Sequence, residues 1–461
     1  MRQVASQEVD LIVRNAGELL TCAGPERGIA GDALKSVAMI KNGALAVRDG
    51  RILAIGTTPE IEQRYSARRA IDAEGALVTP GFVDPHSHLL YGGTRHQEYE
   101  SRVTGRGTPP GLQSGINYTV RHTRDASDER LVNQALADLD VMLEHGTTTL
   151  EAKTGYGLDR ETELRLLRLT AGLDHPIDVI TTYLGAHVVP SDFEDRRDEY
   201  LDLVIDLLPE ASRLAEYCDV CCDPVSFAFD ECLRVGEAAS KLGMGIRVHA
   251  DQTGDSRGAL LAARLHAVSA DHLDYTTDEG FAAMAQAGTT GILFPGVTLH
   301  MCEMTPKPVG EVLMPAEKPF MPLVARRAID SGCIIALSTD YNPGSCPTPS
   351  MQIVMQLAAR LFRLSYAEIW NMCTLNAAVS LGRGSDRGSL EPGKRADVVI
   401  WKVPEHGLVI NRFGVNLVHT VLVAGEVVVT DGRAAHCSTH AVRTPSQSLR
   451  REAKLNRKKE S

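Results

Sequence analysis

Two patterns of apolar and polar positions alternate along the middle of the chain. Short apolar runs, typical of buried strands, are followed by stretches with apolar residues at helical spacing, as in residues 159–171 and 256–265. The eight runs that we interpret as strands end near Asp84, Lys153, Gly185, Asp223, His249, Asp271, Phe294 and Thr339. Strands and helices that alternate in this way predict a parallel sheet.

The number of these units favours one parallel-sheet fold. Eight strand–helix units over about 300 residues fit a closed (β/α)8 barrel. An open doubly wound sheet is the alternative, but no glycine-rich phosphate loop follows the first strand. We therefore expect residues 80–385 to form a (β/α)8 TIM-like barrel, with its chemistry at the carboxyl ends of the strands.

Both ends of the chain carry short β-branched runs joined by tight turns. The runs that indicate strands are residues 11–14, 43–48, 51–55, 396–401, 420–423 and 426–430. Asp49-Gly50 and Asp431-Gly432 are turn signals of the kind found in β-hairpins. Neither end is long enough for a sandwich of two sheets. We therefore expect residues 1–79 and 386–442 to form one small β-sandwich domain together, with the barrel inserted between them.

Composition favours a globular enzyme. The 461 residues are 43% hydrophobic and 23% charged with a net charge of −11, which argues against nucleic-acid binding. No apolar run reaches the roughly 20 residues that cross a bilayer, and the N-terminus has acidic residues where a signal peptide is apolar. Ten cysteines without a repeated CxxC pair indicate a reduced, cytoplasmic setting. The basic residues 443–461 are expected to form a disordered tail, or alternatively one that binds a partner.

Candidate metal ligands lie at the ends of the predicted barrel strands. His86 and His88 follow the first strand, and their spacing places both imidazoles on one face of an extended segment. The fifth strand ends at His249 and the eighth at Asp340. One strand-end histidine is usually an ordinary core residue, but several at the same end of a barrel indicate a shared centre. We expect these four residues to bind one divalent metal, zinc or iron, with a position left for water.

A metal at this place would supply hydroxide at neutral pH, because it lowers the pKa of bound water to about 7. Asp340 is placed to accept the proton of that water, and His272, at the end of the sixth strand, would stabilise the oxyanion or orient the water. Lys153 either takes part in catalysis or pairs with a neighbouring carboxylate. A second metal would need a bridging group deep in the fourth strand, which ends Cys-Cys-Asp at residues 221–223, so one metal is expected.

Several sequence blocks resemble the amidohydrolase superfamily and, within it, the imidazolonepropionase family. The blocks are residues 84–88, 92–100, 151–158, 184–187, 249–252, 269–272 and 339–345, and they follow the family's order. The resemblance implies hydrolysis of the ring amide of 4-imidazolone-5-propanoate to N-formimidoyl-L-glutamate, a step of histidine degradation. Related enzymes are commonly dimers, so a homodimer is expected.

The resemblance also implies roles for residues of the substrate pocket. Arg95 would bind the propanoate carboxylate, a task that suits its planar guanidinium. The remaining pocket residues would be Tyr156, His187, Asn342, Gly344 and Ser345. Gln252 stands where the family carries Glu or Gln, and as an amide it would orient the substrate without transferring a proton.

Two stretches depart from the family pattern. The loop at residues 105–116 has Thr108 where the family usually has a substrate-facing tyrosine, and the fourth strand ends Cys222-Asp223 in place of Cys-Glu. Both departures lie on the substrate side, so the reaction type is better supported than the substrate.

Three alternatives remain at this point. The first is a sister amidohydrolase acting on hydantoin or thiohydantoin propanoate, and the second is a heterocycle deaminase with the same metal centre. The third is a non-catalytic scaffold, which the four expected ligands disfavour. Arg95 favours a substrate with a carboxylate over a nucleobase.

Overall fold

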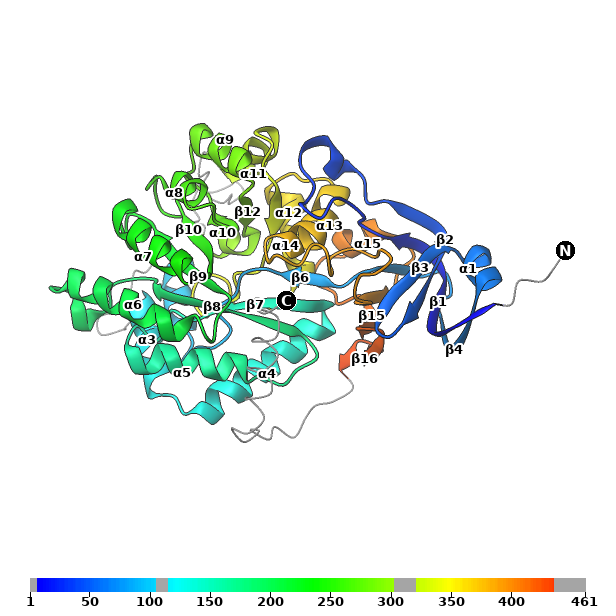
Figure 1. The fold of residues 1–461 in the computed structure, drawn as a ribbon, viewed down its shortest axis with the longest axis horizontal. Helices are drawn as coiled ribbons and strands as arrows, with labels where there is room; N and C mark the ends of the chain where they lie inside the picture. The colour runs from blue at the N-terminus through cyan, green and yellow to red at the C-terminus, as the bar shows by residue number, and fades with distance from the viewer. Residues whose placement is uncertain (1–5, 105–114, 302–320, 435–461) are drawn as a thin grey trace.

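The structure is a computed structural model that describes residues 6–104, 115–301 and 321–434. A barrel with its surrounding helices forms one part of the molecule, and a mixed sheet formed by both ends of the chain lies beside it (Figure 1). Thr108 and the basic tail lie outside the described residues. Among the described helices, none has the length and apolar character that crossing a membrane requires.

Eight parallel strands form the barrel sheet in chain order. They are β6 (Phe82–Asp84), β7 (Thr147–Lys153), β8 (Asp178–Ala186), β9 (Tyr217–Cys222), β10 (Gly245–Ala250), β11 (Ser269–His272), β12 (Thr290–Leu293) and β13 (Ile335–Leu337). Each ends within two residues of the position expected from the sequence. The predicted barrel is confirmed.

Helices follow the barrel strands and cover the sheet (Figure 1). The main ones are α4 (Asp128–Glu144), α5 (Arg160–Ala171), α6 (Arg197–Ala211), α7 (Phe229–Lys241), α8 (Gly258–Arg264), α9 (Asp278–Ala287), α11 (Met321–Asp330), α12 (Met351–Leu361) and α13 (Tyr366–Cys373). The expected helices at 159–171 and 256–265 correspond to α5 and α8. Asp159 defines the start of α5, because its side chain accepts a hydrogen bond from the backbone N–H of Thr162.

Six further helices are described in the two parts. They are α1 (Thr58–Arg64), α2 (His96–Val103), α3 (Gly115–Asp125), α10 (Pro295–Met301), α14 (Leu375–Val379) and α15 (His406–Asn411). The segment α2 follows the first barrel strand and its histidines, so it brings Arg95 and Glu98 to the carboxyl end of the barrel.

The second sheet contains strands from both ends of the chain. Its strands are β1 (Gln7–Leu20), β2 (Met39–Arg48), β3 (Arg51–Thr57), β4 (Tyr65–Asp72), β5 (Leu77–Pro80), β14 (Val398–Trp401), β15 (Val418–Val423), β16 (Glu426–Thr430) and β17 (Arg433–Ala434). The two ends meet where β5 pairs antiparallel with β14. Both predicted turns are hairpin turns in which the Asp and the Gly have positive φ, 51° and 72° for Asp49-Gly50.

The core of this β domain is shared by the two ends. Leu11, Val47 and Ile52 from the first end pack in one apolar cluster with Val398 and Leu422 from the second. This shared core confirms a composite β domain, because neither group of strands buries its apolar face alone. The exact limits of the domains, at residues 79–80 and 385–386, stay predictions.

Hydrogen bonds to the carboxylate of Asp84 join the first barrel strand to the segment that follows the last barrel strand. Its carboxylate accepts from the hydroxyl of Ser338, and from the backbone N–H and hydroxyl of Thr339 at 3.1 and 2.6 Å. The backbone N–H of His88 also donates to the carbonyl of Tyr341 at 2.8 Å. These contacts close the barrel and bring the segments that carry His88 and Asp340 side by side.

Replacing Asp84 with alanine should destabilise the protein, because three buried donors would lose their acceptor. We expect a loss of about 3 kcal/mol in the free energy of unfolding, measured by urea unfolding of metal-free protein. The exposed Asp195→Ala variant is the control. Equal stability of the Asp84→Ala variant and the control would contradict this account of barrel closure.

Candidate metal centre and substrate pocket

Ligand atoms for a metal converge at the carboxyl end of the barrel. The group His86, His88 and His249 and the group His86, His272 and Asp340 each place one ligand atom per residue within 4.8 Å of the others. A carboxylate oxygen of Asp340 lies 3.4 Å from Nε2 of His86 and 3.6 Å from Nε2 of His88. The structure thus brings together all four predicted ligands, with His272 beside them.

Two carboxylates orient two of the histidines. Nδ1 of His86 donates to Asp271 at 2.6 Å, and Nδ1 of His249 donates to Asp219 at 3.1 Å. Since Nδ1 carries the proton in both rings, the lone pair lies on Nε2. Carboxylate–histidine pairs of this kind fix the ring and strengthen its donor nitrogen at metal sites.

Several buried polar atoms of the centre lack a hydrogen-bond partner among the described residues. They are Nε2 of His86, Nδ1 of His88, Nδ1 of His272 and Oδ1 of Asp340. Unpaired buried polar atoms of this kind are costly unless a ligand satisfies them. Imidazole and carboxylate donors suit a divalent transition metal, so the residues fit the metal that the sequence predicts.

The pKa values of His86 and His88 favour a metal over protons on these two rings. Burial, and then the charge of neighbouring cationic groups, holds the pKa of His86 and His88 well below the usual value. Burial would also lower the pKa of His249, but the charge of Asp219 raises it. Burial raises the pKa of Asp340 to about 7, a carboxylate that a metal ion would hold ionised.

Backbone conformation helps to aim two of these side chains. His272 and Asp340 have φ angles of 83° and 50°, in the left-handed region that residues with a Cβ seldom adopt. Each stands where a barrel strand gives way to its following loop, so the backbone turns sharply at the residue that faces the centre. Strained backbone of this kind is concentrated at functional sites.

A buried network of charges lies under the histidines. Nζ of Lys153 contacts Glu151 at 2.8 Å and Asp219 at 3.1 Å, and the guanidinium of Arg247 lies 3.6 Å from Asp271. Lys153 is therefore paired with carboxylates, which is the structural alternative that the sequence left open. Burial alone would raise the pKa of Asp219, but the charges of His249 and Lys153 lower it.

Sequence reasoning missed Asp219 and Arg247, and it used Glu151 and Asp271 only as motif positions. For three of the four a signal was present, because Glu151, Arg247 and Asp271 each lie at i, i+2 spacing from another polar residue of the same strand, whereas Asp219 lies between Tyr217 and Cys221. Arg247 and His249 form one such pair on β10, and Glu151 and Lys153 form another on β7. Alternation of this kind places both members of a pair on the barrel interior.

Arg95 lies just before α2, against Gly344 of the loop that follows Asp340. Its Nε and one terminal nitrogen bind Glu98 at 2.9 and 2.6 Å. The other terminal nitrogen lies against Gly344, where an added Cβ would approach it to 2.0 Å. Gly344 is thus required for the close approach of the guanidinium, and the charge of Arg95 also acts on Tyr156 and His187.

Tyr156 and His187 pack against His88, one of the candidate metal ligands. The rings of His187 and His88 stack with centroids 5.2 Å apart, and the ring of Tyr156 lies 5.3 Å from that of His88. Burial lowers the pKa of His187 to about 4, so this ring is neutral near pH 7. Both side chains are buried beside the centre, and their role in a substrate pocket stays a prediction.

Three other expected pocket residues have different surroundings. The side chain of Asn342 hydrogen-bonds within its own loop, to the carbonyl of Asp340 and to the backbone N–H groups of Gly344 and Ser345. It therefore shapes the loop rather than offering a free amide. The hydroxyl of Ser345 lies 3.4 Å from Asp340. Gln252 is half-buried, and its side chain makes no hydrogen bond within the described part of the chain.

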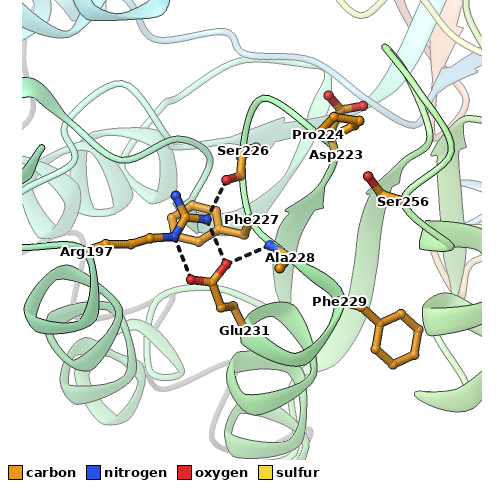
Figure 2. A pocket seen from close by; sticks show the side chains of 9 residues that line it. All are labelled: Arg197, Asp223, Pro224, Ser226, Phe227, Ala228, Phe229, Glu231 and Ser256. Atoms are coloured by element: carbon orange, nitrogen blue, oxygen red, sulfur yellow. Dashed lines mark hydrogen bonds and ion pairs between the residues drawn. The ribbon is translucent and has the colours of Figure 1, made fainter.

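A cavity of about 570 Å³ opens beside β9, away from the metal ligands (Figure 2). Figure 2 shows Arg197 and Glu231 pointing toward each other in it, with contacts of 2.6 and 2.7 Å. Asp223, the residue that departs from the family pattern, lies at its edge and accepts from the backbone N–H of Thr253 at 2.8 Å. Arg197 and Glu231 are paired with each other and Asp223 is bonded to Thr253, so we look for the chemistry at the histidine centre.

Comparison with protein families agrees with the geometry. The sequence matches the amidohydrolase family over residues 77–428, and the bacterial imidazolonepropionase-like composite domain over residues 43–65. It is 40% identical to an imidazolonepropionase of Caldanaerobacter subterraneus over 92% of this chain and 99% of that protein. It is 41% identical to an imidazolonepropionase of Symbiobacterium thermophilum over 92% of this chain and 98% of that protein.

Solved structures with the same fold are more distant in sequence. An adenosine deaminase from Xanthomonas campestris with bound zinc has a TM-score of 0.66 at 18% identity, covering 98% of this chain and 99% of that one. A 5-methylcytosine deaminase from Klebsiella pneumoniae also has a TM-score of 0.66, at 17% identity, covering 94% of this chain and 100% of that one. At these identities the likeness shows a shared fold.

Removing one histidine ligand should empty the centre of metal. We expect the His249→Ala variant to retain less than about a tenth of a metal ion per chain, against about one in the unchanged protein, because a catalytic site needs its protein ligands. Elemental analysis of dialysed protein gives the ratio. His175→Ala, which removes a buried histidine paired with Asp140, is the matched control. Equal metal in the two variants would contradict the assignment.

Proposed function

The chain belongs to the amidohydrolase family and, within it, to the imidazolonepropionases, and we propose that it hydrolyses the ring amide of 4-imidazolone-5-propanoate to N-formimidoyl-L-glutamate in histidine degradation. The observation that carries the proposal is the position of Arg95 against Gly344, close enough for its charge to act on Tyr156 and His187 beside His88. A cation near a hydrolytic metal centre suits a substrate with a reacting ring at one end and a carboxylate at the other.

The substrate would be held at both ends. Arg95 retains one terminal nitrogen outside its contact with Glu98, and this edge would bind the propanoate carboxylate. Tyr156 and His187 would pack against the imidazolone ring, and Gln252, which is half-buried, would orient it. Gly344 and Ser345 would border the pocket below Arg95, with Asn342 keeping their loop in shape.

One divalent ion, zinc or iron, would be held by His86, His88, His249 and Asp340. When bound, it supplies a water of lowered pKa at the carbonyl carbon of the ring. Asp340 would accept the proton of the attacking water and return it to the ring nitrogen as the C–N bond breaks. His272, whose Nδ1 has no partner among the described residues, would stabilise the negative charge that develops on the carbonyl oxygen or orient the water.

The cellular compartment and the oligomeric state of the enzyme belong to the same proposal. A catabolic enzyme with eight described free cysteines, all of them buried, suits a reducing cytoplasm. We also propose a homodimer that acts on a small molecule and needs neither nucleic acid nor a membrane. Analytical ultracentrifugation tests the dimer separately from the activity.

The proposal is tested by a turnover assay on freshly generated 4-imidazolone-5-propanoate, with hydantoin-5-propanoate and its thio analogue alongside. We expect a kcat/KM at least about 100-fold higher on the imidazolone, as befits a difference in recognition of the ring. Preference for either analogue would transfer the assignment to a sister amidohydrolase. Turnover of a nucleobase with no activity on any propanoate would indicate a deaminase.

Arg95→Ala should lower kcat/KM for the propanoate substrate by about 100-fold, because a charge-assisted contact of about 3 kcal/mol is removed. The loss should be less than about 5-fold on an imidazolone that lacks the carboxylate. Arg102→Ala is the matched control, since Arg102 also binds Glu98, at 2.9 Å, but lies farther along α2. Equal losses on both substrates would contradict the role of Arg95.

A further inference from the structure

The loop after β7 is folded around one buried carboxylate. Oε1 of Glu163, in the first turn of α5, accepts hydrogen bonds from the backbone N–H groups of Gly155, Gly157 and Leu158 at 3.1, 2.8 and 2.9 Å. Glu163 is 1% exposed. Three donors on one oxygen form a continuous concave backbone surface of the kind that binds anions.

Two positions of the loop, Gly155 and Gly157, require glycine. Gly155 has a φ of 103°, which a residue with a Cβ seldom adopts, and an added Cβ on Gly157 would lie 2.7 Å from the backbone nitrogen of Glu163. Burial raises the pKa of Glu163, and the hydrogen bonds from the loop act in the opposite direction. A carboxylate that is costly to bury thus has the loop as its principal partner.

A guanidinium holds the same loop through its carbonyl groups. Nε of Arg124, near the end of α3, donates to the carbonyl of Gly157 at 2.8 Å, and one of its terminal nitrogens donates to that of Leu158 at 3.2 Å. Arg124 also pairs with Asp159 at 2.8 Å. The backbone is therefore fixed from both sides, by a carboxylate on its N–H groups and a cation on its carbonyls.

The loop presents two side chains of the proposed substrate pocket. Tyr156 stands between the residues bound by Glu163, 3% exposed, with its ring 5.5 Å from that of His187. Nδ1 of His187 donates to the carbonyl of Gly155 at 2.9 Å. Because a carbonyl only accepts, this bond leaves the lone pair of His187 on Nε2. Any shift of the loop would therefore move Tyr156 and release His187.

We propose that Glu163 is a positioning residue for substrate recognition, which holds Tyr156 and His187 in place by organising the backbone of residues 155–158. The inference rests on the proposed function for the identity of the substrate, but the organisation of the loop is independent of it. Glu163 touches neither the metal ligands nor the substrate in this account.

Two substitutions of Glu163 separate positioning from charge. Glu163→Gln keeps an acceptor oxygen of the same shape, whereas Glu163→Leu removes it. Glu368→Leu is the control, because Glu368 is a 2% exposed carboxylate that also accepts backbone and side-chain bonds, on α13, away from the pocket. The Glu368→Leu variant therefore reports the loss of stability expected when any buried carboxylate is removed from the start of a helix.

Hydrogen exchange of the peptide that covers residues 154–158 tests the loop without any substrate. We expect exchange to be at least about 10-fold faster in Glu163→Leu than in the unchanged protein, because the opening free energy of this loop falls. Glu163→Gln should stay within about 3-fold of the unchanged protein, and so should Glu368→Leu. Unchanged exchange in Glu163→Leu would overturn the proposal.

Kinetics then tests recognition. Glu163→Leu should raise KM for 4-imidazolone-5-propanoate, and the inhibition constant of imidazole-4-propanoate, about 10-fold or more, with kcat changed less than about 3-fold and metal still at about one ion per chain. In a protein that already carries Tyr156→Ala, adding Glu163→Leu should raise KM further by less than about 3-fold, because the two residues act together. Full additivity, or a loss of metal equal to the loss of activity, would overturn the positioning role. If the protein without substitutions turns over no propanoate substrate, the proposed function is contradicted, but the positioning role of Glu163 is not.

Discussion

The hydrogen bonds of Asp84 are the constraint on which the active centre depends. A barrel built from eight sequential strands must bring its first and last strands together, although more than 250 residues separate them in the sequence. Asp84 makes that closure with Ser338 and Thr339. His86 and His88 lie just after this aspartate and Asp340 lies just after Thr339, so the contact that closes the barrel also assembles the centre.

The charges under the centre explain why it suits a cation. The carboxylates of Glu151, Asp219, Asp271 and Asp340 are buried there, and among the described residues Lys153 and Arg247 are the buried lysine and arginine that contact them. The histidines add ring nitrogens that can bind a metal. An interior with this excess of negative charge is costly when metal-free and is stabilised by a divalent ion.

The sequence predicted the parts of the molecule that local patterns determine. Strand ends followed from apolar runs, and the two Asp-Gly hairpins followed from residues that tolerate positive φ. The approach of His249 and Asp340 to His86 was predicted because a barrel brings all its strand ends to one face. The composite β domain followed because neither end of the chain carries enough strands of its own.

Contacts between side chains that are distant in sequence could not be predicted in the same way. Asp219 lies within an apolar run and becomes informative only when β9 and β10 are neighbours, with Asp219 against His249. Asn342 was expected in the substrate pocket, and only the structure shows that its amide is used within its own loop. No local pattern links Glu163 in α5 to the loop after β7, and the contact appears only when the two segments are placed together.

The central claim is that barrel closure builds one metal site from the first, fifth and eighth strands. Anomalous X-ray diffraction from crystals of the metal-loaded protein, recorded on both sides of the metal absorption edge, tests it most directly. One anomalous peak per chain, within coordination distance of His86, His88, His249 and Asp340, is the predicted result. A peak at Asp219 and Asp271 instead, or two peaks per chain, would contradict the account.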